Sequence, residues 1–398
     1  MYGSEVRMIE IIKIESKRIL SKRVFLLFLS LVLLFSVGST YYSLKPYMVP
    51  GVDGIVVSWQ ENLAHARINL QEKTIDWNLL SFIRQRENIT YVDEISLDEI
   101  ARLNYEGKTV QELTDEEIGS FYQIRLSRIQ AMLEENQYTQ YTQGEKEYFI
   151  QKAKKLSEIP FGYAEGWKVL NQDMSAFVPL LIIFISVLLL PLFGTDQKVN
   201  MNELYRSTKH GKKTLDTARI LTAFMVGSVL YVLGMLLFWV IKMIPFGLEG
   251  GMQYIQSNMI TFFSVYNITY LQQFIINTAV GFVALLFDVC LLILITVVME
   301  KIMNSAVVFS FFWIILLLFN QMYLWTLNHY FANFMPLRMT AFSHYYTGNE
   351  IYRIFGHSFS VLSWSIFLSG LIAGFMLVLA IGWQKVKRNV LRVNKKQC

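Results

Sequence analysis

Residues 174–193 read MSAFVPLLIIFISVLLLPLF, a run without a charged residue that decides the fold. A helix of about 20 residues spans about 30 Å, which is the thickness of the hydrocarbon core of a bilayer. The chain of 398 residues is 54% hydrophobic and 17% charged, whereas soluble domains usually carry about 25% charged residues. The run therefore predicts a membrane-spanning helix in an integral membrane protein.

Five more runs have this character, so the sequence predicts an all-α membrane protein with six transmembrane helices, although counts of five and seven stay open. The first run also fits a signal peptide, because Lys22 and Arg23 precede it and Val37-Gly38-Ser39 suits a cleavage site. The 23 residues before it are long for a signal peptide, which favours a retained anchor. The five runs are residues 24–42, 220–241, 275–299, 306–325 and 362–383.

The distribution of Lys and Arg orients the predicted helices. With a cytoplasmic amino terminus, the cytoplasmic segments together hold 19 Lys and Arg residues, whereas the short outer segments 242–274 and 326–361 hold only Lys242, Arg338 and Arg353. Cytoplasmic loops carry the excess of basic residues, so we expect both termini in the cytoplasm and the protein in a plasma membrane, most simply a bacterial one. The cytoplasmic segments are then residues 1–23, 194–219, 300–305 and the basic tail 384–398.

Residues 43–173 are expected to form a large extracellular domain between the first two spans. Residues 51–173 hold 21 acidic and 13 basic residues, and no proline occurs from position 51 to position 159. Because proline breaks helices, its absence predicts a mostly helical domain. Ser96 with Glu99 and Thr114 with Glu117 fit the capping box of a helix start.

An apolar face at helical spacing follows the second box. An ordinary helical core explains it, and a face for an apolar substrate or a second protein is the alternative. Its members are Ile118, Phe121, Tyr122, Ile129, Met132 and Leu133.

Two other stretches bear on the membrane boundary. Phe161, Tyr163 and Trp167 precede the second span, where we expect an aromatic belt at the membrane surface. Residues 252–274 are too rich in Gln, Asn and Thr for a further span. Lipid contact or a partly inserted hairpin is expected there.

The amino-terminal segment, residues 6–23, predicts an amphipathic helix that lies flat on the inner leaflet. Ile11 and Ile14 fall outside its apolar stripe, so a partner-binding element is an alternative to a plain membrane anchor. The basic residues lie largely off the stripe, which consists of Met8, Ile9, Ile12, Ile19 and Leu20.

The cytoplasmic loop 194–219 carries the most specific pattern, on a short polar helix expected to end near Gly211. A phenylalanine and an acid are followed by an apolar residue, two hydroxyl residues, glycine and a basic residue. The pattern resembles that of the type-2 permease (transmembrane) subunit family of ATP-binding-cassette (ABC) transporters. The matching positions are Phe193, Asp196, Leu204, Ser207, Thr208, Gly211 and Lys212, and the departures are Asn200, Met201, Tyr205 and Arg206.

This resemblance implies that the loop couples the membrane part to separate cytosolic ABC ATPase subunits, which bind ATP and Mg. It also implies a second permease chain, identical or different, because one six-span bundle supplies half of the usual pathway. The implied ATPase-coupling residues are Asp196, Glu203, Leu204, Tyr205, Arg206, Ser207, Thr208, Lys209, His210, Gly211 and Lys212.

The chain itself is expected to be a non-catalytic subunit without a cofactor. A phosphate-binding loop needs Gly-x-x-x-x-Gly-Lys-Ser/Thr after a strand. His210-Gly211-Lys212-Lys213-Thr214 lacks the first glycine and the strand. Hydrolase signatures such as Gly-x-Ser-x-Gly and His-Glu-x-x-His are also missing from the sequence.

Asp288 is the candidate polar residue of the membrane part. It stands in the fourth predicted span among Leu286, Phe287 and Val289. A carboxyl group at that depth is costly unless it is paired, protonated or facing water. Two interpretations stay open, namely a role in the substrate path or in ion coupling, and a structural hydrogen bond to a neighbouring helix.

A metal site is not expected. Cys290 and Cys398, the two cysteines, form no motif. His329, His344 and His357 have spacings of 15 and 13 residues, which fit no helical metal motif. We expect these histidines at the surface.

The expected function is export of an amphipathic substrate, such as an antimicrobial peptide, a drug or a lipid-like molecule, driven by a partner ATPase. One alternative is a sodium-extruding permease, in which Asp288 would matter. Another is a membrane sensor whose outside domain binds a ligand or partner without net transport. Membrane lipids are expected partners and nucleic acid is not, because the positive-inside bias and anionic lipids explain the basic excess.

Overall fold

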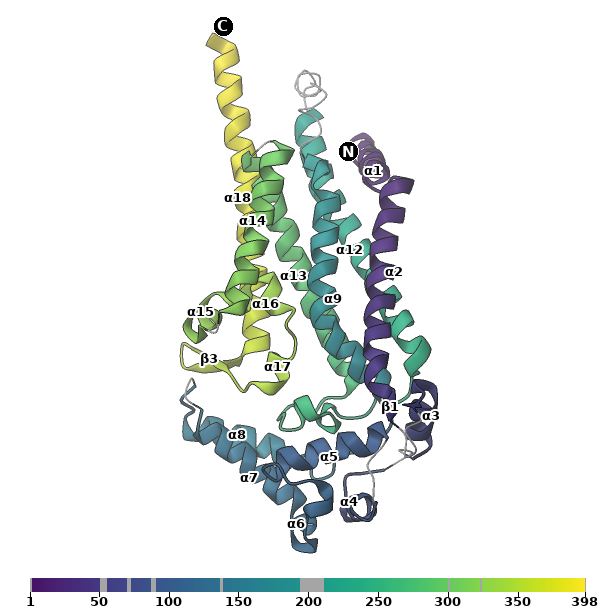
Figure 1. Cartoon of the computed structure of the whole chain (residues 1–398). Coiled ribbons are helices and arrows are strands. Elements are labelled where there is room, and N and C mark those ends of the chain that lie inside the picture. Colours follow the sequence, from purple (N-terminus) through teal and green to yellow (C-terminus); the bar gives the residue numbers. More distant parts are fainter. Residues whose placement is uncertain are drawn as a thin grey trace.

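The computed structural model describes residues 2–50, 56–69, 73–86, 91–136, 139–193, 211–299, 301–322 and 324–397. A bundle of long helices forms one part, and a domain of shorter helices between residues 59 and 154 lies across one end of it (Figure 1). Helix α1 (Tyr2–Ile19) and the last turns of the final helix lie at the other end. We call these the domain end and the terminal end of the bundle.

Six of the described helices are long and apolar enough to cross a membrane, which confirms the predicted count. They are α2 (Lys22–Leu44), α9 (Glu165–Leu189), α12 (Gly211–Phe246), α13 (Tyr270–Met299), α14 (Ile302–Gln321) and α18 (Val361–Gln397). Their candidate spans are Arg23–Tyr47, Glu165–Phe193, Thr214–Phe246, Tyr270–Met299, Ile302–Gln321 and Val361–Val386.

The second span begins well before its predicted start at residue 174, because its polar residues are neutralised inside the protein. Lys168 Nζ donates to Glu165 Oε1 at 2.8 Å, and Tyr47 Oη donates to Glu165 Oε2 at 2.5 Å. Both charged residues are buried. Hydropathy alone placed the start of the predicted run after Asp173, a charge that pairs with Lys242 of α12 inside the protein.

Helices α9 and α13 form the centre of the bundle. Half of the apolar window of each is buried in the protein, against 22% for α2 and α14. Gly281 permits the close approach of α13, since a Cβ added there would lie 2.3 Å from Tyr231 Oη and 2.7 Å from Val178 Cγ1. Helices α2 and α14 present much of their apolar surface outward, as helices that contact lipid do.

The domain between residues 59 and 154 is helical, as predicted. Its core includes Leu63, Leu80, Ile100 and Phe121. It follows a short antiparallel strand pair, β1 (Val49–Pro50) and β2 (Val56–Val57). Its helices are α3 (Trp59–Asn69), α4 (Trp77–Arg84), α5 (Val92–Asn104), α6 (Asp115–Gly119), α7 (Phe121–Glu134) and α8 (Gln143–Lys154).

One of the two predicted capping boxes is present. Thr114 N donates to Glu117 Oε2 at 2.9 Å, and Glu117 N donates to Thr114 Oγ1 at 3.3 Å. The box predicted at Ser96 is wrong, because α5 begins earlier and Glu94 accepts from Tyr91 N at 3.3 Å. The polar spacing at Ser96 therefore lies inside a helix that another acidic residue already caps.

The apolar face predicted after Thr114 belongs to two helices, because the chain turns at Ser120 between α6 and α7. Ile118, Phe121, Ile129 and Leu133 are buried, whereas Met132 is 48% exposed. The ordinary core therefore accounts for most of this face.

The chain between α12 and α13, residues 247–269, folds over the helical domain with short 3-10 helices η3 (Ile255–Ser257) and η4 (Met259–Thr261). Phe262 and Val265 are buried in domain clusters. Arg125 donates to the carbonyl oxygens of Phe262 at 3.0 Å and Ser264 at 3.2 Å. The expected lipid contact or inserted hairpin is wrong for these apolar side chains, because they fill the domain core.

The aromatic residues before the second span are also inside the protein. Tyr163 Oη donates to the carbonyl oxygen of Phe246 at 2.6 Å, and Trp167 Nε1 donates to that of Leu248 at 2.9 Å. Phe161 is fully buried. They fasten α9 to the end of α12, so the predicted belt of membrane-facing aromatics is wrong for these residues.

The described chain between α14 and α18 forms a group of short elements at the domain end of the bundle, which we call the cap. A β-hairpin closes it, and strand β4 runs directly into α18. The elements are α15 (Trp325–Tyr330), η5 (Ala332–Phe334), α16 (Pro336–Met339), α17 (His344–Thr347), β3 (Ile351–Ile354) and β4 (His357–Ser360).

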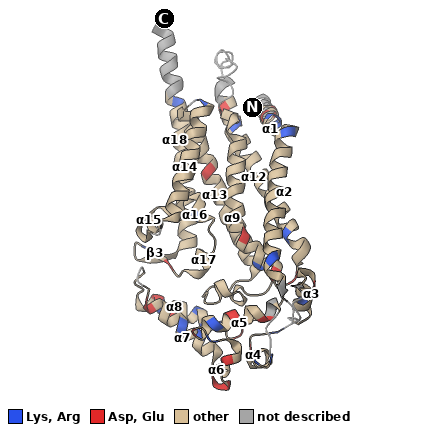
Figure 2. Cartoon of the chain, in the orientation of Figure 1, with Lys and Arg blue, Asp and Glu red and all other residues tan. Residues whose placement is uncertain are grey.

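Charged residues are sparse along the middle of the bundle and gather near its ends and on the helical domain (Figure 2). This is the distribution expected of helices that cross a bilayer. The six apolar helices make the chain a multi-pass membrane protein.

Candidate functional site

The predicted coupling loop lies between two described helices, α9 and α12. Asp196 and residues 203–210 lie outside the described residues. Gly211 and Lys212 are the first residues of α12, so a helix begins at Gly211, where the sequence predicted that one ends. The span of α9 runs through Phe193. The loop therefore connects two helices at the terminal end of the bundle.

Helix α1 is held against both helix ends that frame this loop. Arg219 Nε of α12 donates to Glu15 Oε1 at 2.9 Å, and both residues are only 4% exposed. Arg18 Nη2 lies 2.9 Å from Glu15 Oε2 and donates to the carbonyl oxygen of Leu192 at 3.3 Å. Breaking a buried ion pair by removing one partner costs about 3–5 kcal/mol. The position of α1 is therefore strongly specified.

The packed face of α1 includes most of the predicted stripe, since Met8, Ile12, Ile19 and Leu20 are buried or half-buried. Glu15 and Ile19 are buried, whereas Ile9, a predicted stripe member, is 64% exposed. Ile14 is 67% exposed, as its place outside the stripe suggests. The packed face is centred on a carboxylate whose partner, Arg219, lies far away in the sequence, so apolar periodicity alone does not find it.

Asp288 is fully buried in α13 and accepts hydrogen bonds from two other helices. Ser186 Oγ of α9 donates to Oδ2 at 2.5 Å, and Trp313 Nε1 of α14 donates to Oδ1 at 3.2 Å. Each carboxylate oxygen thus has its own donor. Of the two interpretations drawn from the sequence, this geometry favours the structural hydrogen bond.

A second buried polar cluster lies toward the domain end. Lys242 of α12 is fully buried and forms an ion pair with Asp173 of α9. Ser43 Oγ of α2 donates to the same Asp173 carboxylate at 2.8 Å. The sequence marked Lys242 only as a loop charge, because its partners come from two separate helices.

Amides extend this polar interior to the cap. Asn277 Nδ2 donates to Asn171 Oδ1 at 3.2 Å, and Tyr346 Oη donates to Asn277 Oδ1 at 2.7 Å. A cavity of about 270 Å³ adjoins the network and includes Lys168 and Gln273 in its lining. The sequence analysis did not single out these amides. Their placement inside otherwise apolar helices is the feature by which the sequence could have indicated them.

An ion pair joins the β3–β4 hairpin to the helical domain. Arg353 donates to Glu145 from Nε at 3.0 Å and from Nη2 at 2.6 Å, and Ser358 Oγ donates to the same carboxylate at 2.6 Å. Thr142 N also donates to Glu145 at 2.8 Å, in the capping box of α8. Chiefly through the Arg353 hydrogen bond, these contacts lower the pKa of Glu145 to about 2.

The three outer histidines lie in different environments. His329 is buried, stacks between Trp325 and Tyr352 with ring centroids 4.7 and 4.2 Å away, and contacts Glu350. His344 is half-buried and His357 is exposed. The surface prediction is wrong for His329 because the hairpin folds over it. Within the described ranges, no group of three His, Cys, Asp or Glu residues is arranged to hold a metal ion.

The stacked rings also line a cavity of about 460 Å³ between the hairpin, α15 and α18. Arg353 is on its wall together with His329 and Tyr352. The lining combines flat aromatic surface with hydrogen-bonding edges, which suits an amphipathic molecule.

No family model, curated protein or solved structure matches this chain.

Proposed function

We propose that this chain is the permease subunit of an ABC transporter that exports an amphipathic substrate. The docking of α1 supports the proposal most directly. Glu15 and Arg219 join α1 to α12, and Arg18 joins α1 to the carbonyl oxygen of Leu192 in the span of α9. A force applied to the loop between α9 and α12 therefore moves α1, α9 and α12 together.

Residues 203–212 are the proposed contact with the ATPase. The sequence has no phosphate-binding loop of its own, so ATP and Mg belong to the partner. Energy then arrives as rigid-body movement that shifts an equilibrium between inward-facing and outward-facing states.

We place the terminal end in the cytoplasm and the helical domain outside the cell. The basic residues of the loops and tails support this orientation through the positive-inside rule. In this placement α1 lies where the inner leaflet meets the cytosol.

The substrate class is proposed from the two cavities at the domain end. One includes Lys168 and amide side chains, and the other is lined by stacked aromatic rings and Arg353. A molecule with both apolar and polar faces, such as an antimicrobial peptide, suits them. The outward apolar surface of α2 leaves room for a second permease chain beside the bundle.

Site-specific crosslinking combined with copurification tests the proposal. A photoreactive maleimide is attached to Ser207→Cys, with Ser358→Cys in the hairpin as the matched control, both in a Cys398→Ser background. We expect an ABC ATPase to copurify and to crosslink from position 207 and not from position 358. Its ATP turnover should rise when an antimicrobial peptide is added.

Other results would contradict the permease assignment. Crosslinking of the ATPase from position 358 alone would place the motor at the wrong end. Copurification of a kinase, with no ATPase activity in the complex, would favour the sensor.

A further inference from the structure

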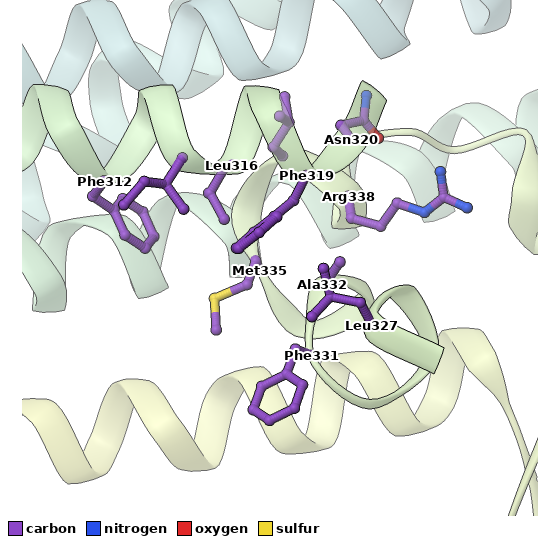
Figure 3. Close-up of a pocket in the computed structure, with 11 residues that line it drawn as sticks. Phe312, Leu316, Phe319, Asn320, Leu327, Phe331, Ala332, Met335 and Arg338 are labelled. Atoms are coloured by element: carbon purple, nitrogen blue, oxygen red, sulfur yellow. The ribbon is translucent and has the colours of Figure 1, made fainter. Parts of the chain in front are cut away.

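An apolar cavity of about 360 Å³ lies between α14 and the cap that follows it (Figure 3). Phenyl rings line much of its wall, and its polar lining residues are Asn320 and Arg338. In Figure 3 the Arg338 guanidinium lies at one edge of the labelled group, on the side away from Phe312. The cavity therefore has an apolar interior and a cationic edge.

Arg338 differs from the other basic residues of the two short outer segments. Lys242 pairs with Asp173, and Arg353 pairs with Glu145. Among the described residues no carboxylate lies within ion-pair distance of Arg338, and its Nε is buried without a hydrogen-bond acceptor. An arginine without a carboxylate partner leaves its charge available to a ligand, so the site favours an anionic ligand.

The cavity runs along the end of a candidate span. From Phe312 to Asn320, α14 rises about 12 Å, and the helix ends at Gln321. The Arg338 edge thus lies where the apolar stretch of α14 stops, at the depth of lipid head groups. The wall of the cavity at Phe312 lies deeper, within the hydrocarbon layer.

The cavity is also accessible from the surface that faces lipid. Phe319 on α14 is 37% exposed and Phe331 is 62% exposed. The apolar window of α14 is only 22% buried, so this helix lies on the outside of the bundle. A membrane lipid therefore enters the cavity from the side, with its acyl chain against the exposed phenyl rings. A soluble anion has no favourable contact with those rings.

We infer that this cavity binds an acyl chain of an anionic phospholipid whose phosphate pairs with Arg338. The planar guanidinium donates two parallel hydrogen bonds to phosphate oxygens, and Asn320 is the other polar residue of the lining. The site is separate from the cavities proposed for the substrate and does not depend on the transport function.

Native mass spectrometry of the purified full chain tests the inference. The protein in uncharged detergent is offered equal amounts of phosphatidylglycerol and phosphatidylcholine with identical acyl chains. We expect about a tenfold preference for the anionic lipid, the size of effect that one charge-assisted hydrogen-bonded pair gives. Arg338→Gln should remove the preference, and Arg338→Lys should keep only part of it, because an ammonium group does not form the paired hydrogen bonds.

Two more variants separate the site from general surface charge. Ala332→Trp places a large ring in the cavity and should reduce retention of both lipids. Arg102→Gln removes an arginine of the helical domain that already has a carboxylate partner, Asp98, and it should leave the preference unchanged.

Several outcomes would overturn the inference. Equal retention of the two lipids by the unmodified chain would remove its basis, as would the same loss in Arg102→Gln as in Arg338→Gln. Stronger binding of a free fatty acid with the same chain would make the ligand a carboxylate. Displacement of the lipid by glycerol phosphate would leave the acyl chain without a role.

Discussion

Asp288 joins α13 to two neighbouring helices through one carboxylate, so its substitution separates a structural role from a transport role. Asp288→Leu removes the acceptor of both Ser186 and Trp313 and should lower the free energy of unfolding by about 1–3 kcal/mol. Asp288→Asn should cost less, because the amide oxygen still accepts one bond. Unfolding in a denaturing detergent measures both values.

Growth in high salt is the companion readout for Asp288. On the structural interpretation, Asp288→Asn leaves salt tolerance unchanged. A stable Asp288→Asn protein that no longer supports growth in high sodium would instead favour the sodium-extruding permease.

The Glu145 carboxylate makes the attachment of the hairpin dependent on pH. Arg353 lowers the pKa of Glu145 from 4.5 to about 2 in the folded chain. The pair therefore stabilises the fold above about pH 4.5, and this stabilisation is lost as the pH falls toward 2. The protection of the β3 and β4 amides against hydrogen exchange, relative to the intrinsic rate at each pH, should fall over that range. Glu145→Gln should exchange fast at neutral pH and show no such dependence.

At the scale of elements, the buried ion pair between Glu15 and Arg219 predicts which substitution loosens the packing of α1. Glu15→Gln removes the carboxylate that accepts from Arg219 Nε, and by the size of such losses it should raise hydrogen exchange in α1 more than tenfold. The exchanged pair Glu15→Arg with Arg219→Glu should restore part of the protection. Unchanged exchange in Glu15→Gln would show that apolar contacts alone hold α1.

Helix packing gives a matched pair of glycine substitutions. Gly281→Ala places a methyl group against Tyr231 and Val178 and should destabilise the bundle by about 1–3 kcal/mol. Gly227→Ala meets its nearest atom at 3.5 Å, an ordinary contact, and should be tolerated. Thermal unfolding of the two variants distinguishes a specific close approach from a general intolerance of change in the bundle.

The sequence predicts the elements better than their contacts. The six spans follow from runs of apolar residues, and the Thr114 box follows from a local hydrogen-bond pattern. The Ser96 box failed because the same spacing also occurs inside polar helices.

The contacts at the candidate site depend on residues far apart in the sequence. Glu15 meets Arg219, and Lys242 meets Asp173 and Ser43, only after the helices have packed. The spacing of apolar residues does not indicate which polar residues will meet across helices. Asp288 was found because an acid in a long apolar run is visible without knowing its neighbours.

For the whole molecule, the orientation across the membrane is open to direct measurement. Cysteines are placed at Gly144 in α8 and Lys385 in α18, in a Cys398→Ser background where Cys290 is buried. A membrane-impermeant maleimide should label position 144 in intact cells, and position 385 only after permeabilisation. The reverse pattern would invert the proposed topology.

Helix α18 gives the molecule a lever. It has 37 residues and no proline, and it starts at the residue after β4. Its length is about 55 Å, so a tilt of about 5° about its first residue moves its far end by roughly 5 Å. The hairpin that leads into it is tied through Arg353 to the domain helix α8. A small displacement of that domain that tilts α18 therefore becomes a shift of several ångströms at the opposite end of the bundle.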